Sequence, residues 1–205
     1  MQKTGMLIVL SGPSGAGKGT ICARLLERNP QLKLSISCTT RLPRPNETEG
    51  VDYFFKSDAE FMKMAEEGEF LEYARVFDYL YGTPRQYVKD QIKKGHDVIL
   101  EIDVQGALKV KDKMDKGVFI FIVPPSMEEL KRRLKKRNSE MEEQALKRFA
   151  TAYLELDFIE KYNYIVVNDE VEKAVKKVEC IITAERCRME RNRGMDEILK
   201  GGKSL

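Results

Sequence analysis

The stretch MLIVL at Met6–Leu10 runs into GPSGAGKGT at Gly12–Thr20, and together these segments decide the fold. A short, wholly apolar run is typical of a strand buried on both faces of a parallel sheet. The glycine-rich segment matches G-x-x-x-x-G-K, and a helix that begins at its end offers free backbone N–H groups and a partial positive charge to an anion. The sequence therefore predicts a strand, a phosphate-binding loop and a helix.

Each residue type in this loop has a physical purpose. Glycines allow positive φ and close backbone approach to a phosphate, and Lys18 supplies a charge for the β and γ oxygens of a nucleotide. The usual motif continues with Ser or Thr as a Mg²⁺ ligand, whereas here Gly19 follows the lysine and Thr20 comes next. We expect Mg²⁺ to be held mostly by nucleotide oxygens and water, with Thr20 facing the phosphates. The predicted nucleotide-binding residues of the loop are Gly12, Pro13, Ser14, Gly15, Ala16, Gly17, Lys18, Gly19 and Thr20.

Composition narrows the class of protein. A chain of 205 residues can bury about 70% of its unfolded surface, enough for a complete core. The formal charge is +3 and both signs are interspersed, so we expect no nucleic-acid or membrane partner. The cysteines form no C-x-x-C pair and His96 is the sole histidine, which argues against a zinc site. The first apolar run is too short for a signal peptide, so a soluble cytoplasmic protein is expected.

The order of the elements predicts an α/β fold, with a doubly wound parallel sheet of the P-loop NTPase type covered by helices. We expect its strands at Met6–Leu10, Val98–Ile102, Val118–Val123 and Tyr164–Val167. The core then comprises residues 1–34 and 92–205. Residues 35–91 are expected to form a small β-containing insert, because VDYFF and FLEYARV have strand-like patterns.

Two further segments have helical patterns. Residues 131–149 carry arginines and glutamates around a polar break at Asn138–Ser139, and we interpret them as a mobile helical lid within the core. The spacing of apolar residues predicts another helix from Val171 to about Arg193. The GGKSL tail has no core-facing residues, and we expect it to be frayed.

Candidate acidic residues lie in ILEIDVQG, where Glu101 and Asp103 come at the carboxyl end of a strand. Ligands bind at that edge of open parallel sheets, so both face the same crevice as the phosphate loop. Asp103 is the stronger candidate, and solvated strand-end acids are the alternative. Asp103–Gly106 also matches the D-x-x-G of GTPases, but no N-K-x-D motif accompanies it, so we discount a GTPase.

A second candidate phosphate site lies in SISCTTRLPRPNETEGVDYFF, where Arg41 and Arg44 flank a proline. Arginine bonds phosphate through paired N–H groups, and the Tyr53 hydroxyl could add a donor. Surface arginines in a proline-rich turn are the alternative. Beside a phosphate loop, however, a second such site suggests a phosphoryl donor and an acceptor.

Several motifs in register resemble the guanylate kinases, the ATP:GMP phosphotransferases among the nucleoside monophosphate kinases, in which a GKGT variant of the loop is familiar. The resemblance extends over about residues 5–190. It rests on GPSGAGKGT, SISCTTRLPRPNETEGVDYFF, EFLEYARVFDYLYGT, ILEIDVQGA, RRLKKRNSE and IVVND.

The resemblance implies an acceptor site. Arg41, Arg44, Tyr53 and Tyr81 would hold the GMP phosphate, Ser37, Glu72 and Thr83 would read the base, and Asp103 would lie beside both. A carboxylate at Glu72 complements the N1–H and N2–H₂ donors of guanine, while Ser37 or Thr83 could donate to O6. Adenine would leave buried polar groups unpaired. Without the resemblance, Glu72 would be interpreted as an exposed acid on an edge strand.

The resemblance also implies that Arg133, Arg137 and Arg148 are lid arginines, which join Lys18 and Arg41 as the expected catalytic residues. An ionised phosphate acceptor requires no general base, so positioning, Mg²⁺ and arginines are sufficient. The lid has Arg137-Asn138-Ser139 where the family has R-G-T. A solvated helical face is the alternative for this segment.

Asn168 and Asp169 fall where the family contacts the adenine of ATP, and a cap between strand and helix explains them equally well.

The expected activity is transfer of the γ-phosphoryl group of MgATP to GMP, and also to dGMP, in purine nucleotide metabolism and GMP recycling. The expected partners are ATP and GMP, and the chain is expected to be a monomer or a homodimer. Two alternatives stay open: a guanylate-kinase-like interaction module without catalysis, and a kinase for another monophosphate. Lys18 and the lid arginines argue against the former.

Overall fold

A computed structural model describes residues 4–137, 142–194 and 199–201. The main sheet is parallel and has the strand order β2-β7-β1-β8-β9. Its strands are β1 (Leu7–Ser11), β2 (Lys33–Leu34), β7 (Val98–Glu101), β8 (Val118–Val123) and β9 (Tyr164–Val167). The predicted α/β class is thus confirmed, and each of the four predicted strands is present. The edge strand β2 was not predicted, because two residues carry no periodicity.

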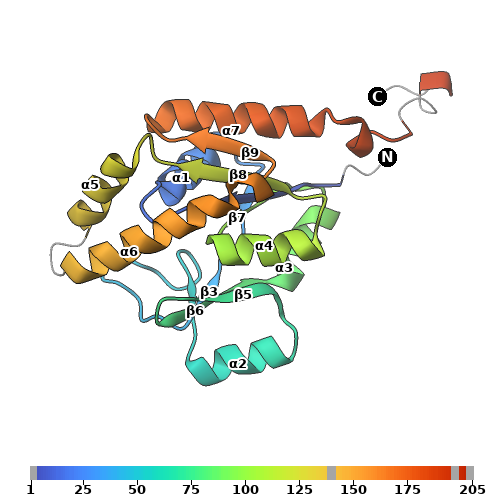
Figure 1. The fold of residues 1–205 in the computed structure, drawn as a ribbon. Helices are drawn as coiled ribbons and strands as arrows, with labels where there is room; N and C mark the ends of the chain where they lie inside the picture. Colours follow the sequence, from blue (N-terminus) through green and yellow to red (C-terminus); the bar gives the residue numbers. More distant parts are fainter. Residues whose placement is uncertain (1–3, 138–141, 195–198, 202–205) are drawn as a thin grey trace.

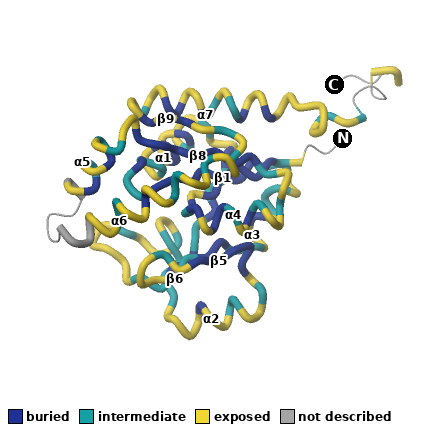
Figure 2. The backbone as a smooth tube through the Cα atoms, viewed as in Figure 1, coloured by how far each residue is buried: buried dark blue, intermediate teal, exposed yellow. Residues whose placement is uncertain are grey.

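Alternation along β1 explains why helices cover both faces of this sheet. Ile8 and Leu10 pack toward a cluster that contains residues of α1 (Lys18–Arg28) and α7 (Val171–Arg186). Leu7 and Val9 pack toward residues of α3 (Arg85–Lys93) and α4 (Val104–Lys113). Every residue of β1 is buried, as Figure 2 shows for the dark centre of the upper layer.

A smaller sheet lies apart from the main one and beneath it in Figure 1. It has the order β4-β3-β6-β5. The strands are β3 (Cys38–Thr39), β4 (Phe54–Phe55), β5 (Phe70–Val76) and β6 (Tyr79–Pro84), and α2 (Asp58–Glu66) covers their outer side. Phe61 of α2 stacks on Phe70 of β5, with ring centroids 4.5 Å apart. Cys38, Phe61, Phe70 and Leu80 form a small core of their own between this sheet and α2.

The predicted lid contains two helices, α5 (Met127–Arg137) and α6 (Glu142–Glu155). The predicted polar break at Asn138–Ser139 lies outside the described residues. Leu130 and Leu134 of α5 pack with Ala152 of α6, so the helices form a hairpin with an apolar seam. A 3₁₀ turn, η1 (Leu156–Lys161), leads from α6 to β9.

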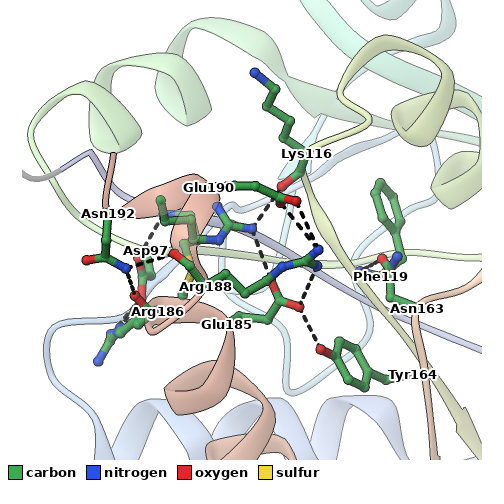
Figure 3. A network of polar contacts seen from close by, with 12 residues as sticks. Asp97, Lys116, Phe119, Asn163, Tyr164, Glu185, Arg186, Arg188, Glu190 and Asn192 are labelled. Carbon is green, nitrogen blue, oxygen red and sulfur yellow. Dashed lines mark hydrogen bonds and ion pairs between the residues drawn. The ribbon is translucent and has the colours of Figure 1, made fainter. Parts of the chain in front are cut away.

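The last helix ends earlier than the sequence pattern predicts. The prediction extended to about Arg193, whereas α7 ends at Arg186 and is followed by a 3₁₀ turn, η2 (Met189–Arg191). Arg188 has an extended backbone (φ −61°, ψ 137°), and its guanidinium and that of Arg191 contact the buried carboxylate of Glu185. Figure 3 shows Arg188 beside Glu185. The chain therefore leaves the helix because its polar residues fold back on Glu185.

The same network ties α7 to the sheet edge remote from the phosphate loop. Arg186 pairs with Asp97, which precedes β7, at 2.6 Å, and Asp97 also accepts from the backbone N–H of Met6. Tyr164 donates to Glu185 at 2.6 Å. Within the described ranges, no helix is both long and apolar enough to cross a membrane.

Candidate active site

The phosphate-binding loop has the backbone that its glycines predict. Gly12, Gly15 and Gly17 have φ of 134°, 87° and 93°, values in the region that favours glycine. A Cβ on Gly12 would lie 2.1 Å from the carbonyl oxygen of Ile122, and one on Gly17 would lie 2.3 Å from the side-chain nitrogen of Asn168. The loop therefore needs glycine both for its turn and for its close packing.

Lys18 is the first residue of α1, and its ammonium group folds over the loop. It donates to the carbonyl oxygens of Gly12 at 2.6 Å and Pro13 at 3.2 Å. No side chain caps the N-terminus of α1, so no side chain competes with an anion for the first backbone N–H groups of the helix. Thr20, which follows Gly19 in α1, is exposed.

A single cavity of about 440 Å³ joins the loop to the smaller sheet. The main sheet and its loop contribute Gly12, Ser14, Gly15, Gly17, Lys18, Gly19, Thr20, Glu101, Ile102, Asp103 and Gln105, the smaller sheet contributes Ser37, Tyr53, Glu72, Arg75, Val76, Phe77 and Tyr81, and α6 contributes Arg148, Thr151 and Glu155. Most sequence-predicted site residues thus meet in one space, although they come from segments far apart in the chain.

Glu72 is a buried acid at the base of this cavity, with only 3% of its surface exposed. It pairs across the strands with Thr83, whose hydroxyl donates to its carboxylate at 2.7 Å. Burial raises the pKa of Glu72 to about 7, and nearby Asp103 adds to the rise. Gly106 makes room for both acids, since a Cβ there would lie 2.8 Å from a Glu72 oxygen and 2.9 Å from an Asp103 oxygen. The sequence prediction missed this role of Gly106.

Asp103 caps α4, because its carboxylate accepts from the backbone N–H of Gly106 at 3.1 Å. Burial raises its pKa, while that hydrogen bond and the charge of Lys18 lower it. Asp103 therefore has a structural role at the helix terminus and also lines the cavity beside the loop.

The predicted second phosphate site, at Arg41 and Arg44, also contains Glu47. Its carboxylate accepts from the Arg41 guanidinium at 2.8 Å and from the Arg44 backbone N–H at 2.8 Å. Arg41 also reaches the Tyr81 hydroxyl at 3.3 Å and lies over the Tyr53 ring. Glu47 thus holds Arg41 against both predicted tyrosines, whereas the side chain of Arg44 is 64% exposed.

Asn168 lies directly beneath the phosphate loop rather than among the cavity residues. Its side chain is buried and donates to the carbonyl oxygen of Ala16 at 2.8 Å. Asp169 is exposed and accepts from the backbone N–H of Glu170. The hydrogen bond to Ala16 gives Asn168 a role in supporting the loop.

The predicted lid arginines have different environments. Arg133 is held by Glu129 at 2.7 Å and by the carbonyl oxygen of Asn168 at 3.0 Å, outside the cavity. Arg148 lines the cavity and lies over the ring of Phe77. Arg137 ends α5, and its side chain is outside the described part of the structure.

Sequence reasoning missed Thr151 and Glu155 on α6. They follow Arg148 by three and seven residues, so the three side chains lie on one helical face, and all line the cavity. Burial raises the pKa of Glu155 to about 7, and the Lys18 charge opposes that rise. The only available sequence signal was this helical spacing from Arg148.

Comparisons with known proteins agree with this arrangement. The family model described as Guanylate kinase matches residues 4–185. The chain belongs to the guanylate kinase family. A curated relative from Caldanaerobacter subterraneus subsp. tengcongensis, named Guanylate kinase, is 58% identical over 95% of each chain. Another from Clostridium perfringens strain 13, also named Guanylate kinase, is 57% identical over 91% of this chain and 87% of its own.

A solved structure supports the same relationship. The crystal structure of guanylate kinase from Anaplasma phagocytophilum has a TM-score of 0.83, with 36% identity over 98% of this chain and 97% of that chain. The guanylate kinase resemblance inferred from the motifs is therefore confirmed at the levels of sequence and fold.

Proposed function

We propose that this guanylate kinase family member transfers the γ-phosphoryl group of MgATP to GMP, giving ADP and GDP. The observation that carries the proposal is the shared cavity, which the phosphate loop and the smaller sheet line together. Phosphoryl transfer requires the attacking and leaving oxygens to lie in line. A donor site and an acceptor site that open into one space meet that requirement without a covalent intermediate.

On the donor side, the loop and the start of α1 would bind the ATP phosphates. Backbone N–H groups of a helix N-terminus favour negative charge. Lys18 would leave the carbonyl oxygens of Gly12 and Pro13 for the β and γ oxygens, since an ionised phosphate attracts an ammonium more strongly than a neutral carbonyl does. Asn168 would act through its hydrogen bond to Ala16, which fixes the loop, and its predicted contact with adenine stays a prediction.

On the acceptor side, Arg41, Arg44, Tyr53 and Tyr81 would bind the GMP phosphate. Arg41 contacts the Tyr81 hydroxyl and the Tyr53 ring, so three of these four groups already lie next to one another. Deeper in the cavity, ionised Glu72 would accept the N1–H and N2–H₂ donors of guanine. Thr83 directs its proton to Glu72, so Ser37 is the better donor for O6.

The transfer itself needs charge stabilisation rather than proton abstraction. The phosphate of GMP is ionised near neutral pH and attacks as it is, so no side chain must act as a base. Arg148 lines the cavity that both proposed sites share, where its guanidinium would stabilise charge on the transferring group. Arg133 and Arg137 would assist after movement of α5. We propose that residues 131–149 close over ATP and that the 35–91 unit closes over GMP, which would exclude water.

The residues also fit a nucleotide-borne Mg²⁺. Thr20 and Asp103 offer oxygen atoms at the loop, and Mg²⁺ prefers oxygen ligands. Among the described residues no three His, Cys, Asp or Glu side chains form a metal-binding group, and Mg²⁺ in kinases is held chiefly by substrate phosphates and one or two carboxylates. When bound, Mg²⁺ would neutralise charge on the β and γ phosphates. Thr20 and Asp103 would orient its waters.

A coupled ADP-release assay tests the proposal with GMP, dGMP, AMP, UMP and dTMP as acceptors. We expect turnover with GMP and dGMP and little with the others. Turnover with AMP but not GMP would identify a kinase for another monophosphate. GMP binding without ADP release would favour a non-catalytic interaction module.

A further inference from the structure

A strained aromatic residue stands at the tip of the β5–β6 hairpin. Of the described residues other than glycine, Phe77 alone has positive φ, at 54°. Phe77 and Asp78 form the two-residue connection between β5 and β6. Such turns favour glycine or asparagine where φ is positive, and a bulky side chain rarely adopts this conformation. A phenylalanine here requires an explanation beyond turn geometry.

Burial does not supply that explanation. Phe77 is 46% exposed, so its ring does not compensate the strained backbone by joining a core. Instead the ring lines the cavity, together with Val76 and Arg75 from the end of the same strand. The strain therefore keeps a half-exposed ring at the proposed site of reaction, and stored strain of this kind is typical of functional positions.

The ring faces Arg148 of α6. The guanidinium carbon of Arg148 lies 5.8 Å from the ring centroid, within the range of a cation–π contact. Phe77 belongs to the unit that would bind GMP, and Arg148 belongs to the helix pair that would cover ATP. The contact thus joins the two parts whose approach the proposed reaction requires.

A ring also suits an arginine that must bind phosphate. A π face attracts the cation without accepting any N–H bond through an oxygen. The ring contact itself therefore takes up none of the N–H groups that bind phosphate oxygens.

We propose that Phe77 is a positioning residue for phosphoryl transfer, whose ring orients the Arg148 guanidinium between the donor and acceptor phosphates. The inference rests on the proposed function, in which Arg148 stabilises the transferring group. Because the hairpin carries the ring, Arg148 would be correctly oriented only when the GMP-binding unit is in place. When the GMP-binding unit is not in place, Arg148 would be misoriented, and transfer of the phosphoryl group to water would be disfavoured.

The test compares Phe77→Leu, Phe77→Tyr and Phe77→Gly in the full chain by steady-state kinetics with ATP and GMP. We expect Phe77→Leu to lower kcat about tenfold, because a small misplacement of a catalytic group lowers the rate of the chemical step. Both KM values should stay within about twofold of wild type. Phe77→Tyr should retain kcat because it keeps the ring. Phe77→Gly should lose kcat like the leucine variant while its thermal midpoint stays the same or rises, since glycine relieves the strain.

Tyr79→Leu is the matched control, because Tyr79 is an aromatic residue of similar exposure on the same hairpin and does not line the cavity. Its kcat should be unchanged. Combining Phe77→Leu with Arg148→Ala should cost no more kcat than Arg148→Ala alone. A full additional loss in the double variant, or full kcat in Phe77→Gly, would overturn the inference.

The proposed function can fail separately. If the wild-type chain releases no ADP with GMP, the proposed function is wrong and the inference falls with it. If the wild type is active and Phe77→Leu has wild-type kcat, only the inference is wrong.

Discussion

The hydroxyl of Thr83 donates a 2.7 Å hydrogen bond to the carboxylate of Glu72, and both residues are buried on adjacent strands. This bond favours the ionised form of Glu72, whereas burial and the charge of Asp103 favour the protonated form. The outcome is a pKa of about 7 for a group that must be ionised to accept two N–H bonds from guanine.

The pH dependence of GMP use follows from this balance. Below pH 7 the folded protein holds Glu72 increasingly as the neutral acid, so GMP binding weakens as pH falls. Between pH 6 and pH 8 the ionised fraction rises about tenfold, and kcat/KM for GMP should rise by about that factor. Glu72→Gln should remove this component and leave the titration of GMP itself. A wild-type profile parallel to that of the glutamine variant would contradict the assignment.

Thr83→Val should shift that profile. Valine matches threonine in shape but removes the donor, so the pKa of Glu72 rises further and the increase in kcat/KM moves to higher pH. Thr83→Ser keeps a hydroxyl and should restore the wild-type midpoint. Equal midpoints for valine and serine would show that the hydrogen bond has no influence on Glu72.

Base selectivity should depend on the same carboxylate. Glu72→Gln replaces an acceptor with a group that presents one donor and one acceptor, so the preference for GMP over AMP should fall by about 10² or more. Glu66→Gln, an exposed acid on α2, is the control. The ratio of kcat/KM values with GMP and AMP measures the effect, and a ratio equal to that of wild type would be incompatible with the proposed role.

Lys18→Met should abolish turnover while GMP binding survives. Lys18 lies on the loop side of the cavity and contacts loop carbonyl oxygens, whereas Glu72 and Arg41 belong to the smaller sheet. Calorimetric titration with GMP and the ADP-release assay separate the two effects. Wild-type turnover in this variant would refute the role of Lys18.

Glu47→Gln should weaken GMP binding without changing the site for ATP. The neutral amide loses the charge that holds Arg41, so KM for GMP should rise about tenfold, the effect of a lost charge-assisted hydrogen bond. KM for ATP should stay within about twofold of wild type. A lower KM for GMP would instead mean that Glu47 competes with the phosphate for Arg41.

The network around Glu185 should affect stability alone. Glu185 is only 2% exposed, and its carboxylate binds Tyr164, Arg188 and Arg191; Figure 3 shows the Tyr164 and Arg188 contacts. Glu185→Gln should lower the free energy of unfolding by about 1–3 kcal/mol, and Glu190→Gln, at an exposed partner of Arg188, should change it little. Denaturant melts measure both. Pairing lowers the pKa of Glu185, so this stabilisation is present above the ordinary carboxyl pKa and is lost as pH falls through the lowered value.

The sequence by itself determined the features that depend on residues close to one another along the chain. The loop conformation follows from the positions of Gly12, Gly15 and Gly17, because positive φ is cheap only for glycine. The strand–loop–helix order follows from the apolar run and the motif. The α/β class follows from strands that alternate with helices. Motif order also identified the family before any contact was known.

The tertiary structure alone decided which distant side chains meet. Glu155 on α6 lines the same cavity as Lys18, Asn168 supports Ala16, and Phe77 reaches Arg148. None of these pairs has a local signature, because each depends on how the smaller sheet and the helical hairpin pack against the main sheet. The end of α7 was mispredicted for the same reason: its helical pattern continues, but buried Glu185 attracts the arginines that follow and turns the chain back. Local sequence sets backbone conformation, and long-range packing sets the partners and pKa values on which the chemistry depends.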